Sequence, residues 1–275
     1  MGLASGDTER MQVAGHCLGE VVTMLGDFSL PVIIPVLRKT LYEGDSNTKR
    51  GVCVGLTEVI KCSSKDQILR FIEIIVKLVQ DALCDEDELV CQMASASFQS
   101  LYSVVGNRAL DEVVPSLMVA LETSFDDKSR NQALNGLRGI LSLRSKDLLP
   151  YIVPRLIQKP VSKSHADALA GISKVTGETI FYHFHAIVPV LLGELADSYE
   201  SVESGDDEEA RVQAIKECCL AICGSVSEAG VSSLINEIAS KSSHDKPEIR
   251  MAVCWMFESA ITERKLDYFS WPSHF

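Results

Sequence analysis

The chain has 275 residues, 46% of them hydrophobic and 23% charged, and a formal net charge of −12. This acidic balance argues against a nucleic-acid or anionic-membrane surface, because both ligands need basic residues for binding. No apolar run approaches the roughly 20 residues needed to cross a bilayer, and the first residues lack the basic and apolar regions of a signal peptide.

The first expected helix covers residues 9–25 and follows a segment, 1–8, that we expect to be disordered. A proline-containing helix is expected next, over residues 30–42. Pro31 suits its first turn, where the missing N–H has no cost, and Pro35 should kink the helix unless it also lies in that turn. A second helix, 48–60, is rich in small residues, which allow close packing against two neighbours.

The proline-containing segment recurs about every forty residues. Its copies are IIPVL at 33–37, IIVKL at 74–78, VVPSL at 113–117, IVPRL at 152–156 and IVPVL at 187–191. A period of this size indicates a helical repeat array. Second helices of small and apolar residues are expected after the four later copies, at 89–105, 129–143, 164–176 and 209–226, and another is expected at 248–261. The lengths exceed ten residues and no period-2 alternation appears, which argues against strands.

Paired helices with a proline in the first and an Asp…Arg pattern at the turn resemble HEAT repeats. We therefore predict an all-α fold, an α-solenoid of about five to six helix pairs plus a partial N-terminal unit. It would form a single domain over residues 9–262, followed by an irregular tail at 263–275. Each unit of such an array buries its apolar face against its neighbours. The pairs are expected at 29–63, 65–106, 108–143, 145–176, 178–229 and 230–262.

Four turns place an aspartate four or five residues before an arginine. These pairs are Asp45 and Arg50, Asp126 and Arg130, Asp206 and Arg211, and Asp245 and Arg250. The aspartate can face the arginine of a neighbouring unit, which would build an inter-repeat ladder of charges. The alternative is an ordinary N-cap beside a solvated arginine. Cys91 takes the arginine position in one unit, and the unit at 160–176 has no such pair.

An acidic loop is expected over residues 196–209, between the two helices of the fifth pair. From Val175 to Ala210 the chain has nine acidic residues and no lysine or arginine. A solvated loop is one interpretation. The alternative is a contact for a basic segment of a partner protein, and the candidate residues are Glu203, Asp206, Asp207, Glu208 and Glu209.

Motifs that would carry catalysis are missing from the sequence. Neither GxxxxGK[ST] nor GxGxxG occurs, and none of the six histidines is followed by glutamate, as the iron site of HEAT-type hydroxylases requires. The nine cysteines are odd in number and most lie within apolar helical patterns, which favours free buried thiols over a disulfide framework. We therefore predict no catalytic residue, no cofactor and no metal.

Several strings around the repeats resemble the general-control translational activator family. They include LGDFSLPVIIPVL at 25–37, RGVCVGLTEVI at 50–60, VVGNRALDEVVPSLM at 104–118, LLPYIVPRLIQKPV at 148–161 and ALAGISKVTG at 168–177. The resemblance runs in order from about residue 8 to about residue 262. The family consists of large ribosome-associated HEAT proteins that stimulate the kinase acting on the alpha subunit of initiation factor 2. Because its members are much longer, we expect this chain to be a fragment.

The resemblance implies a non-catalytic scaffold that acts in the cytoplasm during the response to amino-acid starvation. The partners it implies are the N-terminal module of the kinase, the ribosome and an ABC-type protein, but it assigns none of them to particular residues. Two alternatives remain. One is a HEAT protein of the nuclear transport receptor type, which would bind basic cargo, and the other is a helical-repeat enzyme.

Overall fold

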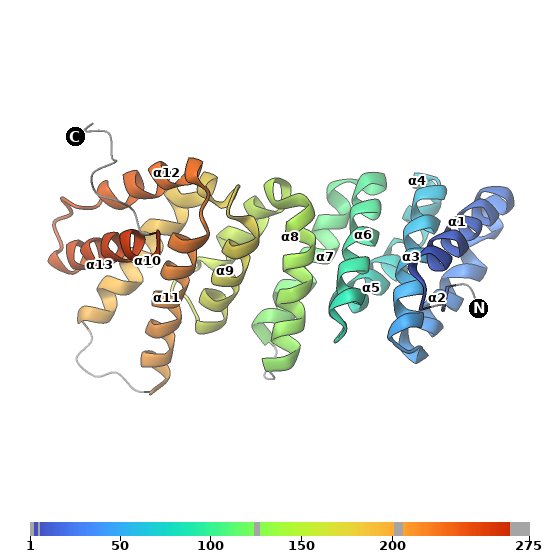
Figure 1. The fold of residues 1–275 in the computed structure, drawn as a ribbon, viewed down its shortest axis with the longest axis horizontal. Coiled ribbons are helices and arrows are strands. Elements are labelled where there is room, and N and C mark those ends of the chain that lie inside the picture. The colour runs from blue at the N-terminus through green and yellow to red at the C-terminus, as the bar shows by residue number, and fades with distance from the viewer. Residues whose placement is uncertain (1–2, 5, 124–126, 201–205, 265–275) are drawn as a thin grey trace. The chain divides into compact units, whose positions relative to one another are not determined.

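A computed structural model describes residues 3–4, 6–123, 127–200 and 206–264. Regular structure in these residues is helical throughout, which confirms the predicted all-α fold and its HEAT-type helix pairs (Figure 1). The chain divides into two compact units, Met1–Leu143 and Arg144–Phe275. The helix α8, Asp127–Leu156, contributes residues to both of them.

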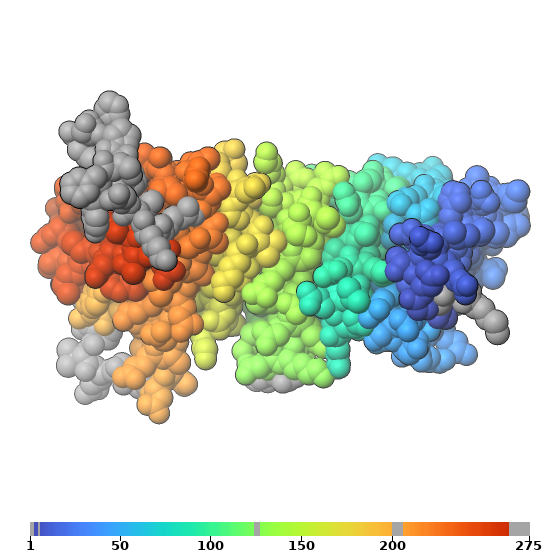
Figure 2. Space-filling model, in the orientation of Figure 1, coloured from blue at the N-terminus to red at the C-terminus, as the bar shows by residue number. Residues whose placement is uncertain are grey.

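The first unit consists of two rows of helices. In one row α3 contacts α1 and α6, and α2, α5 and α7 form the second row against it. The space-filling view shows side chains of successive helices in contact along the visible face of this unit (Figure 2). The bounds are Thr8–Leu25 for α1, Gly26–Phe28 for the short 3-10 helix η1, Leu30–Glu43 for α2, Ser46–Cys62 for α3, Lys65–Arg70 for α4, Ile72–Leu83 for α5, Glu88–Val105 for α6 and Asn107–Thr123 for α7.

The second unit repeats this arrangement. Helix α11 contacts α9 on one side and α13 on the other, while α10 contacts α12 and also packs across against α11 and α13. The bounds are Lys163–Thr176 for α9, Ile180–His183 for the 3-10 helix η2, Phe184–Glu200 for α10, Asp206–Ser225 for α11, Glu228–Ala239 for α12 and Pro247–Arg264 for α13.

Small residues set the close approach of α1 to α3, as the sequence pattern predicts. A Cβ atom added at Gly15 would lie 2.8 Å from Val54 Cγ1, and one added at Gly19 would lie 2.8 Å from Cys62 Sγ. Neither distance leaves room for a side chain. The two glycines therefore allow the backbone of α1 to pack directly against side chains of α3. The apolar core lies between the helices along this row.

Helix breaks fall at two places that the proline pattern does not mark. Pro35 lies inside α2, which continues as one helix from Leu30 to Glu43. The copy that lacks the proline is interrupted earlier, because Phe71 (φ −113°, ψ 13°) separates α4 from α5. The turn expected near residue 144 consists of a single non-helical residue, Arg144 (φ −143°, ψ 46°), within α8.

Parts of the range 196–209, where the sequence predicts an acidic loop, are helical. Helix α10 extends to Glu200 and α11 begins at Asp206. Acidic side chains stabilise the first turn of a helix because they face its partial positive charge, so residues 206–209 are helical. Residues 201–205, part of the segment 1–8 and the tail from 265 onward lie outside the described residues.

Candidate functional site

The first unit contains an ion-pair link between successive repeats. Arg50 Nη2 in α3 lies 2.7 Å from Asp87 Oδ2, in the turn before α6. Lys49 Nζ lies 2.7 Å from Asp85 Oδ2 in the same turn. Hydrogen bonding to Arg50 is the main cause that lowers the pKa of Asp87. These contacts connect two units in the way that a charge ladder requires.

Asp45 and Asp87 each cap a helix, and Asp87 also takes part in this link. Asp45, predicted as a ladder residue, accepts a hydrogen bond from the Thr48 N–H at 2.9 Å and thereby caps α3. Asp87 caps α6, accepting from the Leu89 N–H at 2.9 Å, and also binds Arg50. Sequence analysis missed Asp87 because Cys91 stands where the pattern has arginine. The signal that could have revealed Asp87 is its own capping position at the start of a helix.

The other predicted arginine of the first unit, Arg130, binds within its own helix. Its Nη1 donates to Asp127 Oδ1 at 2.8 Å, while Asp126 lies outside the described residues. Nearby, Lys128 Nζ lies 2.6 Å from Glu86 Oε1, and both side chains are mostly exposed. Lys128 thus makes a contact back to the preceding turn.

In the second unit, Arg211 of α11 has a different set of partners. It donates to Glu194 Oε2 of α10 at 2.5 Å, to Glu208 at 2.6 Å and to the carbonyl oxygen of Val161 at 3.2 Å. The Glu194 side chain is only 4% exposed. The hydrogen bond with Glu208 raises the pKa of Arg211, and the hydrogen bond with Glu194 raises it by a smaller amount. The structure thus pairs Arg211 with two glutamates and not with Asp206.

Arg250 stabilises a loop through backbone contacts. Its Nη1 donates to the carbonyl oxygens of His244 at 2.8 Å and Asp245 at 3.0 Å. The predicted pairing with the Asp245 carboxylate is replaced by these backbone contacts, because the turn brings both carbonyl groups toward the guanidinium. Arg250 therefore stabilises the loop that precedes α13 through contacts within its own unit.

The acidic residues predicted as a partner contact form the first turn of α11. Asp206, Asp207 and Glu209 are exposed, whereas Glu208 is half-buried and binds Arg211. This hydrogen bond with Arg211 lowers the pKa of Glu208. Glu203 lies outside the described residues. The described part of the predicted contact thus combines a structural glutamate with three acidic side chains at the surface.

The buried cysteines offer little nucleophilic chemistry. All nine are free, and Cys53, Cys91, Cys218, Cys219 and Cys223 are buried. Burial raises the pKa of the Cys53 thiol to about 12 and also raises that of Cys219, which disfavours the reactive thiolate. Among the described residues, no three His, Cys, Asp or Glu side chains are grouped to hold a metal ion.

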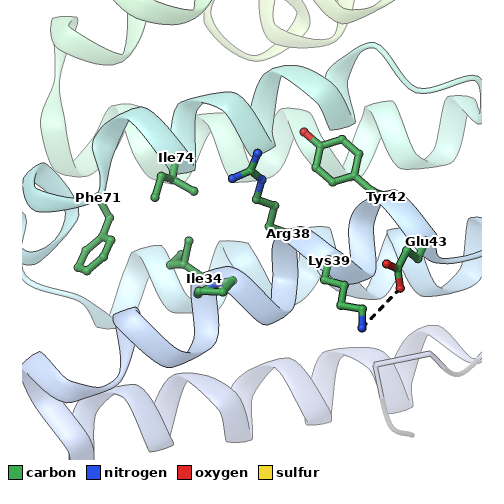
Figure 3. Close-up of a pocket in the computed structure, with 8 residues that line it drawn as sticks. Ile34, Arg38, Lys39, Tyr42, Glu43, Phe71 and Ile74 are labelled. Carbon is green, nitrogen blue, oxygen red and sulfur yellow. Dashed lines mark ion pairs between the residues drawn. The ribbon is translucent and has the colours of Figure 1, made fainter.

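A groove of about 330 Å³ lies between α2 and α5 (Figure 3). Its lining consists of Ile34, Pro35, Arg38, Lys39, Tyr42, Glu43, Phe71 and Ile74. The Tyr42 hydroxyl donates to Asp81, which also binds Lys77 Nζ at 2.9 Å. Sequence analysis did not find this groove, because its two walls come from segments about forty residues apart.

Over the described ranges, no helix combines the length and the apolar character that a membrane crossing requires.

Residues 148–273 match the family described as stalled ribosome sensor GCN1-like, HEAT repeats. The eIF-2-alpha kinase activator GCN1 of Dictyostelium discoideum is 32% identical over 252 residues, covering 92% of this chain and 9% of that protein. The stalled ribosome sensor GCN1 of Homo sapiens is 31% identical over 268 residues, covering 98% and 10%. In Saccharomyces cerevisiae, the eIF-2-alpha kinase activator GCN1 is 30% identical, covering 97% and 10%. The chain thus spans about a tenth of the length of these relatives.

Among solved structures, the chain is similar to one described as a Kap95:Nup1 complex, with a TM-score of 0.43 and 12% identity over 94% of this chain and 34% of that chain. A structure of importin beta gives a TM-score of 0.41 and 15% identity over 94% and 34%.

Proposed function

Because this chain belongs to the GCN1-like HEAT-repeat family, we propose that it is a HEAT-repeat segment of a translational activator that stimulates the kinase phosphorylating initiation factor 2 alpha. The observation that carries the proposal is the alignment of more than nine tenths of the chain with relatives named for kinase activation and stalled-ribosome sensing. The alignment covers about a tenth of each relative, so the activity of the whole protein is part of the proposal.

The segment acts as a scaffold without chemistry of its own. Stacked helix pairs offer long surfaces for protein partners, and the charge of −12 suits basic partner segments. Raised pKa values at the buried thiols give no support to a cysteine nucleophile. In this proposal the contacts of Arg50 and Arg211 hold neighbouring helices together, while Asp206 and Asp207 at the start of α11 are available to a basic segment.

The partners of the whole protein would be the ribosome, the N-terminal module of the kinase and an ABC-type protein, and its location the cytoplasm. The names of the relatives support the ribosome and the kinase. The ABC-type partner rests on family resemblance alone.

A chimera tests the proposal. The corresponding segment of the full-length yeast relative would be exchanged for this chain, and the chimera would be assayed for co-sedimentation with ribosomes, capture of the kinase N-terminal module and phosphorylation of initiation factor 2 alpha under starvation. We expect all three to be retained. A stably expressed chimera that loses ribosome and kinase binding would overturn the proposal, and tight binding of a basic localisation peptide would favour a transport receptor.

A further inference from the structure

The groove between α2 and α5 combines an apolar floor with a cationic rim. Ile34 is buried at its base, while Ile74 is 37% exposed and the Tyr42 side chain forms part of the wall. Apolar surface that faces a concave space is the usual lining of a site for a partner side chain. The groove therefore offers room for one large apolar group on Ile34, Phe71 and Ile74.

The charges at the rim do not balance. Lys39 Nζ lies 3.9 Å from Glu43 Oε2, and Lys77 Nζ lies 2.9 Å from Asp81 Oδ1. Arg38 is exposed, and its side chain extends from α2 toward α5 between Ile74 and Tyr42 (Figure 3). The charged lining residues are Arg38, Lys39 and Glu43, and Lys77 and Asp81 form an adjacent ion pair. Together they supply three cations against two carboxylates, so the rim carries an excess positive charge on a chain whose net charge is −12.

Tyr42, one of the residues that line the groove, links its two walls. Its hydroxyl donates to Asp81 on α5, so the ring bridges the two helices. The Asp81 carboxylate is therefore engaged by Tyr42 and Lys77, while the Arg38 side chain extends between Ile74 and Tyr42 beside the apolar floor (Figure 3). Guanidinium groups bind carboxylates through two parallel hydrogen bonds, which makes arginine suited to recognise such a group.

We propose that this groove binds a short segment of a partner protein that places a large apolar side chain on Ile34, Phe71 and Ile74 and a neighbouring carboxylate on Arg38. Charge complementarity favours this occupant, because the excess positive charge of the rim would attract a carboxylate and repel a basic segment. The inference rests on the proposed scaffold function only in that the ligand is a protein, and it adds a surface distinct from the acidic turn of α11.

Peptide selection followed by binding measurements tests the inference. A displayed library of random 12-residue peptides would be panned on the full chain, and enriched peptides would be measured by fluorescence anisotropy. We expect the enriched sequences to pair an aromatic or aliphatic residue with Asp or Glu. Labelled methyl groups of Ile34 and Ile74 should shift in NMR spectra on peptide addition, which places the peptide in the groove.

Matched variants separate the groove from general electrostatics. Arg38→Glu should weaken binding at least tenfold, and a peptide with lysine in place of its acidic residue should regain binding to this variant. Lys65→Glu makes the same charge change at an exposed site in the same unit, outside the groove lining, and should alter binding less than twofold. Arg38→Gln gives a second variant if Arg38→Glu has a lowered urea midpoint.

The inference fails if no peptide is recovered, if enriched peptides lack acidic residues, if Lys65→Glu weakens binding as much as Arg38→Glu, or if the Ile34 and Ile74 methyl groups do not shift. This outcome is separate from the chimera assay. A chimera that retains ribosome and kinase binding while the peptide experiment fails leaves the proposed function standing and removes only the groove.

Discussion

Arg50 in the first unit and Arg211 in the second follow the same turn-and-helix pattern, but they bind different partners. Arg50 reaches forward to Asp87 in the next repeat, and both side chains retain about a fifth of their exposure. Arg211 binds Glu194, a nearly inaccessible carboxylate, and the carbonyl oxygen of Val161. The turn-and-helix pattern therefore predicts where the arginine lies in each unit. The environment of the arginine determines how much stability its contacts contribute.

The second unit should be the more sensitive to loss of its arginine. Arg211→Ala leaves Glu194 buried without a cation, and removing one partner of a buried pair is strongly destabilising. We expect a loss of about 3 kcal/mol in the free energy of unfolding, measured by urea denaturation. Buried thiols give a local probe, since Cys218, Cys219 and Cys223 share α11 with Arg211. Their labelling should accelerate more than that of Cys53 and Cys91.

A double variant provides the control for this prediction. Replacing both partners, as in Arg211→Met with Glu194→Met, removes the stranded charge and should restore much of the lost stability. Equal stability of Arg211→Ala and the original chain at neutral pH would contradict the assignment of Glu194 as a residue that depends on this pair.

The link between repeats in the first unit should contribute less. Arg50→Ala removes a partly exposed ion pair, and we expect a decrease of about 1 kcal/mol in the free energy of unfolding. Lys128→Ala is the matched control, because the pair of Lys128 with Glu86 is mostly exposed. It should change stability by less than about 0.5 kcal/mol. An equal effect of both variants would mean that the Arg50 link contributes no more to stability than an exposed ion pair.

Acid should reduce the contribution of the Arg50 link. The pKa of Asp87 is lowered in the folded chain, mainly by Arg50, so its stabilisation is present above the unfolded pKa of about 4 and is lost as pH falls through the folded value. The difference in urea midpoint between the original chain and Asp87→Asn should therefore be constant near pH 7 and shrink below about pH 4. A difference independent of pH down to strong acid would show that the charge of Asp87 is not involved.

The smallest effect is expected at the exposed start of α11. Asp207→Asn removes one negative charge from the first helical turn, which should cost about 0.3 kcal/mol at low salt. Added salt should reduce this difference, since exposed charges are screened. Stability measured in low and high salt checks the prediction, and a large loss that salt does not change would indicate a specific contact for Asp207.

The helix pairs could be derived from the sequence because their causes are local. A proline at the first turn, as with Pro31 in α2, and an aspartate one residue before a helix, as with Asp45 and α3, act within a few residues of each other. The forty-residue period then counts the units. Residues 206–209 were expected in the acidic loop because of their charge, although four acidic side chains also suit the first turn of α11.

Contacts between repeats could be identified only from the tertiary structure. Asp87 lies 37 residues from Arg50, and Ile74 lies forty residues from Ile34, so both relationships depend on how far one helix pair is rotated against the next. Arg211 likewise had acidic neighbours on both sides in the sequence, and packing of α10 against α11 selected the buried Glu194 as one of its partners. The sequence by itself determined the helices, their pairing and the family, because local spacing controls them. Only the packing decided which charges pair and where the groove opens.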